Sequence, residues 1–189
     1  MFRQLGLGLV LIIAAWGAQA QTAMVALGDS SAHFRYGMLI GGQSFGRSEA
    51  AVGLMYNSDQ NLLADLGIFI VDEAGSKAPG LEAGVGGKLV YARNDPLKQN
   101  FFVGALGGSL RYAIPGMTRL AIGGDGFFAP SIVSGLDASR YWEYSARVEY
   151  EVLSQAAAFI GYRYMGGDNK DKVRVDINKS FHLGLRVTF

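Results

Sequence analysis

Apolar and polar residues alternate along most of the chain after residue 21, and a period of two is the pattern of a β-strand with one apolar face. The stretch 142–152 shows this most clearly. Its even positions are mostly apolar and its odd positions are polar: Trp142, Tyr144, Ala146, Val148, Tyr150 and Val152 alternate with Glu143, Ser145, Arg147, Glu149 and Glu151. Weaker versions of the pattern recur along the chain. Together they predict ten strands, near 22–28, 32–43, 47–57, 61–72, 80–93, 100–113, 117–129, 139–153, 155–166 and 179–189.

The lengths of these strands and of their connections favour a membrane barrel. Most of the strands reach the roughly 9–11 residues that cross a bilayer at a tilt. Long and short connections largely alternate, as they do in outer-membrane barrels. The charged segment 166–178 is predicted to be a long loop, whereas 114–116 and 153–155 are predicted to be tight turns. The connection 72–79 breaks this rule, because it is long where a short turn is expected.

A soluble β-sandwich would also alternate, but the charges on the polar face favour a barrel. Acids and bases balance there, as an interior requires when buried charges must be paired. The predicted lumen network contains Glu49, Asp65, Glu82, Lys88, Arg111, Arg119, Asp125, Glu143, Arg147, Glu149, Glu151, Arg163 and Arg186, with Arg47 as a further base. The predicted fold is therefore an all-β transmembrane antiparallel barrel of ten strands. Eight strands with a separate N-terminal hairpin, residues 22–43, is the alternative.

The aromatic residues of the apolar face point the same way. Tyrosine and tryptophan form girdles at the membrane–water interfaces of such barrels. Tyr36 shares the apolar face, and the predicted girdle lies mostly toward strand ends: Tyr56, Tyr91, Tyr112, Trp142, Tyr162 and Tyr164.

The first twenty residues have the features of an export signal. Arg3 precedes an apolar segment, 5–16, and Ala18-Gln19-Ala20 has the form of a cleavage site. The alternative is a membrane anchor, but the apolar segment is shorter than the roughly 18 residues that a spanning helix needs. We therefore expect a cleaved signal peptide, 1–20, and one barrel domain, 21–189. The chain has no cysteine, so no disulfide would hold the exported domain.

The chain closes on FHLGLRVTF, with apolar residues at every second position up to Phe189. This segment resembles the last strand of outer-membrane barrels, which commonly ends on phenylalanine. The resemblance implies that Phe189 is an assembly signal, and that the outer-membrane assembly machinery of a Gram-negative bacterium is a partner. The net charge of +1 gives no reason to expect nucleic acid as a partner.

Sites for chemistry are scarce in this sequence. The segment 80–89 departs from the phosphate-binding loop in two required positions. His33, near Ser30 and Ser31, is interpreted as a loop residue, and His182 as a polar lumen residue. We therefore expect no catalytic residue, no metal, no cofactor and no enzymatic activity. Outer basic residues could pair with the phosphates of lipopolysaccharide, or could simply be solvated: Arg93, Lys98, Arg140, Lys170, Lys172, Arg174 and Lys179.

The run 129–164 and the closing HLGLRVTF resemble the YfaZ family of predicted outer-membrane proteins. The likeness is carried by Ala129-Pro130, by the Tyr-x-Glu pattern at 141–143 and by Gly-Tyr-Arg at 161–163. It implies an outer-membrane location and a barrel fold, but it carries no activity. The expected function is a structural or surface-interaction protein with a lumen filled by side chains, in contact with outer-membrane lipid and lipopolysaccharide. A narrow porin-like channel for ions or small solutes is the alternative.

Overall fold

The computed structural model describes residues 21–189 except 44–45, 76–77, 95–97 and 118, so the predicted signal peptide lies outside the described residues. The described elements are β1 (Gln21–Gly28), β2 (Ser31–Gln43), β3 (Gly46–Asn57), β4 (Leu62–Glu73), β5 (Leu81–Asn94), β6 (Gln99–Ala113), β7 (Leu120–Ala129), the 3₁₀ turn η3 (Ser131–Val133), β8 (Ser134–Leu136), β9 (Ala138–Leu153), β10 (Ala156–Asn169) and β11 (Arg174–Thr188). No helix among these residues is long and apolar enough to cross a membrane.

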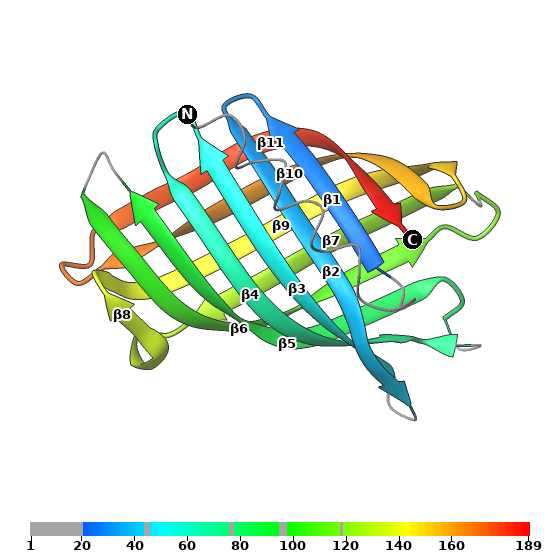
Figure 1. Ribbon diagram of the computed structural model, residues 1–189, viewed down its shortest axis with the longest axis horizontal. Helices are drawn as coiled ribbons and strands as arrows, with labels where there is room; N and C mark the ends of the chain where they lie inside the picture. Colours follow the sequence, from blue (N-terminus) through cyan, green and yellow to red (C-terminus); the bar gives the residue numbers. More distant parts are fainter. Residues whose placement is uncertain (1–20, 44–45, 76–77, 95–97, 118) are drawn as a thin grey trace, which may run out of the picture.

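Ten of these strands form a closed antiparallel barrel, which confirms the predicted all-β barrel and its strand number (Figure 1). The ring runs β5-β4-β3-β2-β1-β11-β10-β9-β7-β6, and pairing of β5 with β6 closes it. The three-residue strand β8 pairs with β6 beside this ring. The alternative with a separate hairpin is wrong, because β1 and β2 are wall strands: β1 pairs with β11 on one side and with β2 on the other.

The last hairpin differs from the prediction. β10 extends to Asn169 and β11 begins at Arg174, so the long loop predicted at 166–178 is mostly strand. The cause is a β-bulge: Met165 pairs with Asn178 and Gly166 pairs with Asp176, which leaves Ile177 without a partner across the ladder. Ile177 and Asn178 are both buried. The bulge therefore interrupts the alternation on which the sequence-based prediction relied.

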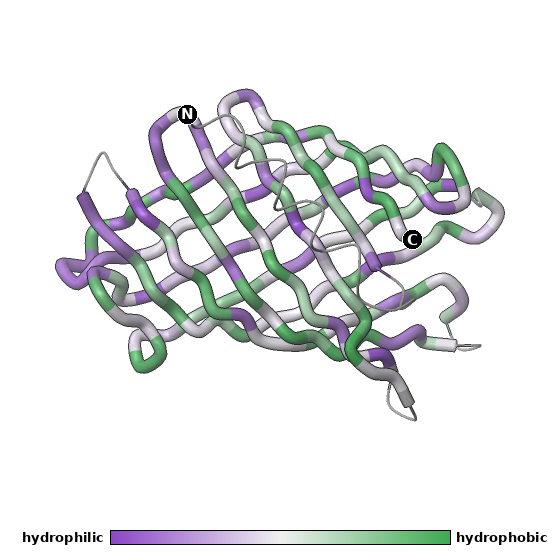
Figure 2. Tube along the Cα trace, viewed as in Figure 1, coloured by the Kyte–Doolittle hydropathy of each residue, from purple (hydrophilic) through white to green (hydrophobic). Residues whose placement is uncertain are grey.

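Side chains alternate between the lumen and the outer wall along most of each long strand. Figure 2 shows hydrophobic and hydrophilic residues succeeding one another along the strands. The start of β1 and the end of β11 meet at one end of the barrel, where the Gln21 N–H donates to the Phe189 carbonyl at 2.7 Å and the Phe189 N–H donates to the Gln21 carbonyl at 2.9 Å. We call this the terminal end. The opposite end, which carries η3 and β8, is called the loop end.

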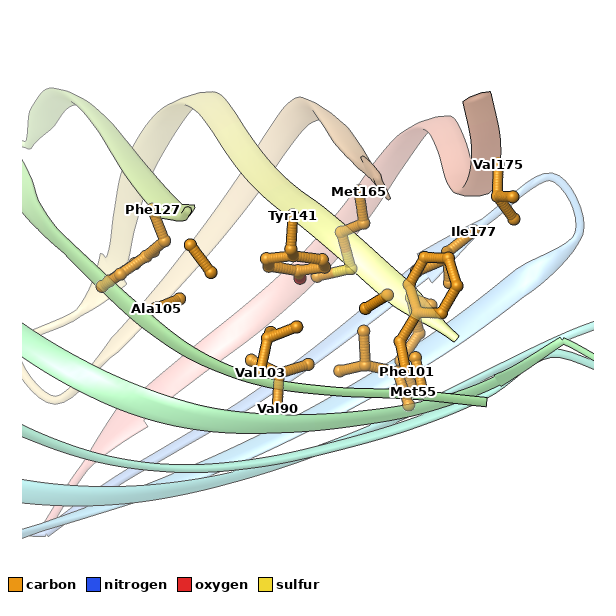
Figure 3. Packing of buried hydrophobic residues seen from close by; sticks show 14 of the residues in the cluster. Met55, Val90, Phe101, Val103, Ala105, Phe127, Tyr141, Met165, Val175 and Ile177 are labelled. Atoms are coloured by element: carbon orange, nitrogen blue, oxygen red, sulfur yellow. The ribbon is translucent and has the colours of Figure 1, made fainter. Parts of the chain in front are cut away.

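The lumen at the loop end is packed with apolar side chains. Leu63, Val90, Val103 and Met165 have exposed fractions of 0%, and so does the ring of Tyr141. Figure 3 shows Tyr141 and Met165 on one side of the lumen facing Val90 and Val103 on the other. This apolar plug is a hydrophobic core inside the barrel, and it fills the loop-end half of the lumen.

Candidate functional site

The terminal half of the lumen holds a cavity of about 500 Å³, which we call the terminal chamber. Its lining runs from the terminal rim to the middle of the barrel and includes Thr22, Thr188, Arg47, Arg147, Arg163 and His33. The lining residues come from all ten wall strands, mostly from their lumen-facing positions. The chamber is thus the polar counterpart of the apolar plug.

Two phenylalanine rings form the boundary between the chamber and the plug. Phe69 and Phe127 meet edge to face, with ring centroids 5.8 Å apart. A cation lies over each ring: the Arg35 guanidinium carbon is 5.0 Å from the centroid of Phe69, and the Lys88 ammonium is 4.4 Å from that of Phe127. Such cation–π contacts let charged groups rest against an apolar floor.

Glycines in the neighbouring strands make room for these rings. A Cβ atom added at Gly86 would lie 2.7 Å from the Phe69 ring, and one at Gly107 would lie 2.6 Å from the Phe127 ring. Each would also collide with a backbone carbonyl of the adjacent strand. The segment 80–89 therefore uses a glycine for close packing of the wall, as expected for glycines inside strands.

On the chamber side of the plug, Glu143 forms a buried ion pair with Lys88. The Lys88 ammonium donates to Glu143 Oε2 at 2.5 Å, and the Tyr141 hydroxyl donates to the same oxygen at 2.7 Å. The Lys88 and Glu143 side chains have exposed fractions of only 1% and 5%. A carboxylate at this depth is tolerable because two donors replace its water.

Glu149 is the centre of a larger cluster in the chamber. Its carboxylate, 1% exposed, accepts hydrogen bonds from Arg111 at 2.9 Å, from Arg147 at 2.8 Å and from Arg186 at 2.8 Å. Arg147 also reaches Asp125 at 3.1 Å. At the terminal rim, Arg47 pairs with Glu82. The contacts of Glu149 and Arg147 connect β6, β7, β9 and β11 through the lumen.

The remaining residues of the predicted network are placed differently. Asp65 and Arg163 are buried, and Glu49 lines the chamber, but among the described residues none of the three forms an ion pair. Glu151 lies beside the turn at the terminal rim. Arg119 lies exposed just before β7, because the connection 114–119 is longer than the predicted tight turn. It lines the same rim pocket as Glu151, together with Arg111 and Glu149, but forms no ion pair among the described residues.

Both histidines are buried in the wall and face the lumen. His33 is 7% exposed and belongs to β2, so its interpretation as a loop residue is wrong, because the connection before β2 is only residues 29–30. His182 is 5% exposed, and its ring lies edge to face with Phe159. Nδ1 of each histidine has no hydrogen-bond partner among the described residues. Among these residues, no group of three or more His, Asp or Glu is arranged to hold a metal ion.

The sequence reasoning missed Arg35 and Tyr141 as lumen residues. Arg35 shares its strand face with His33, and Tyr141 shares its face with Glu143. Both residues sit two positions from a polar lumen residue, so the same alternation could have found them. Arg35 was overlooked because alternation was not traced along its strand. Tyr141 was overlooked because it lies just before the stretch 142–152 in which alternation was traced, and it was named only in the Tyr-x-Glu pattern.

The predicted girdle residues all lie on the outer wall. Tyr56, Tyr91, Trp142, Tyr162 and Tyr164 lie toward the loop end, whereas Tyr112 is near the end of β6 at the terminal end. Tyr164 is only 6% exposed, because it stacks on Tyr144 with ring centroids 5.2 Å apart. Of the outer basic residues, Arg174 and Lys179 join this aromatic group in a groove, whereas Arg93, Lys98, Arg140, Lys170 and Lys172 are exposed elsewhere at the loop end.

Comparisons with known proteins bear on the family to which the chain belongs. A comparison with curated proteins found no match. The family model described as YfaZ precursor matches residues 3–189, which is nearly the whole chain. The match covers every wall strand and agrees with the resemblance seen at 129–164 and at the closing strand. The chain therefore belongs to the YfaZ family.

Proposed function

We propose that this protein spans the outer membrane of a Gram-negative bacterium as a non-conducting barrel with a structural role in the envelope. The outer wall supports this location. Large apolar side chains on it are exposed, among them Leu66 at 59%, Ile68 at 60%, Leu106 at 71% and Leu183 at 63%. Lipid is the environment that covers such a wall. A closed ring has no strand edge, so no backbone N–H or C=O group of the wall is left without a hydrogen-bond partner in lipid.

The observation that carries the proposed role is the apolar plug. Ions cross a barrel only along a continuous wet path, and the plug interrupts that path with side chains that have no exposed surface. Barrels of about eight strands have interiors that side chains just fill, and ten strands add little room. The terminal chamber is a polar recess above this plug, so the lumen supports a structural barrel better than a channel.

The orientation follows from the termini and the connections. An exported chain whose two ends meet at the terminal end would place that end in the periplasm, as barrels of this type do. Most loop-end connections are short: residues 58–61 join β3 to β4, and 170–173 join β10 to β11, whereas 130–137, between β7 and β9, carries η3 and β8. Contact with other molecules would therefore involve the barrel wall more than long loops. The proposal includes outer-membrane lipid, lipopolysaccharide and the assembly machinery as partners, and includes no nucleic acid, no cofactor and no catalysis.

Membrane insertion is tested by cell fractionation and by electrophoretic mobility with and without heating. We expect a band in the outer-membrane fraction that moves differently when unheated, because a closed barrel resists detergent until it is heated. A soluble periplasmic protein with one mobility would contradict the membrane location.

The closed lumen is tested by conductance in planar lipid bilayers. Wild-type protein should give no current steps, whereas a Y141A/M165A variant, which removes two plug side chains, should give them. Y150A is the matched control, because Tyr150 lies on the outer wall and is half exposed. Regular current steps from the wild-type barrel would favour the porin-like alternative.

A further inference from the structure

A groove of about 600 Å³ lies on the outer wall near the loop end, across β9, β10 and β11. We call it the rim groove. It combines four aromatic residues with two cations and one acid: Trp142, Tyr144, Tyr162, Tyr164, Arg174, Lys179 and Asp176. The lumen network does not use these residues. Arg174 and Lys179 are among the outer basic residues that the sequence analysis considered as partners of lipopolysaccharide phosphates, and the groove adds the aromatic residues around them.

Short-range contacts hold the groove in shape. The Arg174 guanidinium carbon lies 4.9 Å from the centroid of the Trp142 ring. Tyr164 stacks on Tyr144 at an interplanar angle of 19°, and its hydroxyl donates to Asp176 Oδ1 at 2.5 Å. These contacts fix the aromatic side chains before any ligand arrives.

The β-bulge of the last hairpin builds the groove. Because Ile177 and Asn178 both turn inward, Asp176 and Lys179 both lie on the outer wall. Lys179 then pairs across the ladder with Tyr164. If the residues alternated without a bulge from Asp176 onward, Lys179 would point into the lumen.

Because Gly166 has no side chain, the Tyr164 ring can lie over it. Gly166 lies between Trp142 and Asp176 in the register of the three strands. A Cβ atom added there would lie 2.6 Å from the Tyr164 hydroxyl. The tyrosine ring therefore occupies the place that a side chain at this position would need.

The charges of the groove favour an anion. Asp176 accepts the Tyr164 hydroxyl, whereas Arg174 and Lys179 form no ion pair among the described residues. Just beyond the groove, Asp168 pairs across the ladder with both Arg140 and Arg174. A cation on the lipid-facing wall is least costly at the membrane interface, which is also where aromatic girdles lie. A phosphate at this level would meet two donors with unused hydrogen-bonding capacity.

The wall beside the groove identifies the source of the phosphate. Below the aromatic residues, toward the middle of the barrel, the same strands expose Ile160 at 61%, Phe181 at 72% and Leu183 at 63%. Tyr162 and Phe181 touch edge to face, so this apolar strip is continuous with the groove. A molecule that fills both has a phosphate at one end and acyl chains at the other.

We propose that the rim groove binds the phosphorylated headgroup of a lipid in the leaflet at the loop end, with the acyl chains against the β10–β11 wall. The proposal rests on the proposed membrane location. Arg174 and Lys179 hold the phosphate, and the aromatic residues flank the headgroup. Lipopolysaccharide has this chemistry, so its lipid A part is the probe for the test.

Trp142 makes the test direct. The chain contains two tryptophans, Trp16 and Trp142, so in a W16F background every change in tryptophan emission comes from the groove. The barrel is inserted into phosphatidylcholine vesicles, and lipid A is added at increasing fractions. We expect a saturable change in emission with lipid A and a much smaller one with dephosphorylated lipid A.

Two variants test the cations. R174Q/K179Q should weaken the response by at least about tenfold, because charged hydrogen bonds to phosphate are lost. D176N should preserve or strengthen it, because it removes a neighbouring negative charge. R93Q is the matched control, since Arg93 is an exposed cation near the loop end on β5, away from the groove. Heat-dependent mobility of each variant shows that it is folded.

Four results would overturn the proposal. One is an equal response to lipid A with and without phosphate. A second is an equal loss in R93Q, which would mean a general charge effect. A third is displacement of lipid A by inorganic phosphate at a similar concentration, which would mean that the groove takes free phosphate. The fourth is a barrel that inserts, with the expected heat-dependent mobility, but shows no response. A protein that fails to insert would instead contradict the proposed membrane location.

Discussion

Individual lumen residues show how charge is accommodated inside a narrow barrel. Glu149 has its carboxylate surrounded by three arginines, and Glu143 has Lys88 and Tyr141. Removing one partner from such a group leaves the other buried without compensation, which costs more than the pair itself contributes. The depth of a pair therefore decides how much its loss matters.

The Lys88–Glu143 pair allows this to be measured. K88M should lower the free energy of unfolding by about 3–5 kcal/mol, because it leaves the Glu143 carboxylate buried with only the Tyr141 hydroxyl. Urea unfolding of the barrel in lipid vesicles, followed by tryptophan emission, measures the change. The double variant K88M/E143Q should recover part of the loss, since it removes the stranded charge.

R47M is the control at the rim. Arg47 pairs with Glu82 where the two side chains are 41% and 27% exposed, so water screens the pair. Its loss should cost less than about 1 kcal/mol. An equal cost for K88M and R47M would mean that the lumen is hydrated throughout.

Alternation was sufficient to find most of these residues from the sequence. It placed Glu143, Arg147 and Glu149 on the lumen face, where the structure has them. It could not pair them, because a partner such as Arg186 or Arg111 lies on a different strand, and the height of each residue depends on the register. His33 was misplaced although it lies within the predicted strand 32–43, because it was grouped with the serines of the preceding turn and not assigned to a face of that strand.

At the level of elements, the sequence predicted the β-strands well where the period of two is unbroken. The predicted strand 47–57 and the observed β3, Gly46–Asn57, nearly coincide. The prediction of the last hairpin was wrong because a bulge adds one residue to β11. After such an insertion, the face that carried even-numbered residues carries odd-numbered ones. A single-sequence pattern has no means of distinguishing this from a loop.

The close approach of neighbouring strands is itself testable. G107A should lower the free energy of unfolding by about 1–3 kcal/mol, since the new methyl group forces the backbone apart. The added Cβ would lie 2.0 Å from the Gly126 carbonyl oxygen. Unfolding in urea measures the cost.

G41A is the matched control. A Cβ atom at Gly41 meets nothing within 4 Å, and its φ lies outside the left-handed region. The change in its free energy of unfolding should stay within about 0.5 kcal/mol. If the two substitutions cost the same, the spacing of β6 and β7 would be wider than the structure has it.

For the whole molecule, the main finding that the sequence reasoning missed is the change of lumen character along the barrel axis. The lumen positions of β3 run from Arg47 and Glu49 to Ala51 and Met55, and other strands change in the same direction. The residues were on the predicted face, but the face was treated as uniformly polar. Alternation gives the side of the sheet, whereas the height at which apolar positions from separate strands meet needs the closed register.

Phe189 separates folding stability from assembly. Its ring is 58% exposed on the outer wall, and its backbone supplies the pairing with Gln21. F189A should therefore change the free energy of unfolding of the refolded barrel by less than about 0.5 kcal/mol, as expected of an exposed side chain. If Phe189 is an assembly signal, the amount of folded barrel in the outer membrane of cells should fall several-fold.

V187A is the comparison, since Val187 lies on the same face of β11 and is 38% exposed. It should leave the cellular yield of folded barrel unchanged. Equal yields for F189A and wild type would remove the role of Phe189 in assembly, while leaving the fold untouched.

The apolar plug closes the lumen toward the loop end, so the terminal chamber opens only at the terminal end. A molecule inside it can exchange only with the solution at the terminal end, and it must leave by the way it entered. Its occupancy would then follow the concentration on that side alone, whatever the concentration on the other. If the barrel spans the membrane as proposed, a voltage or concentration gradient across that membrane could not drive such a molecule past the plug.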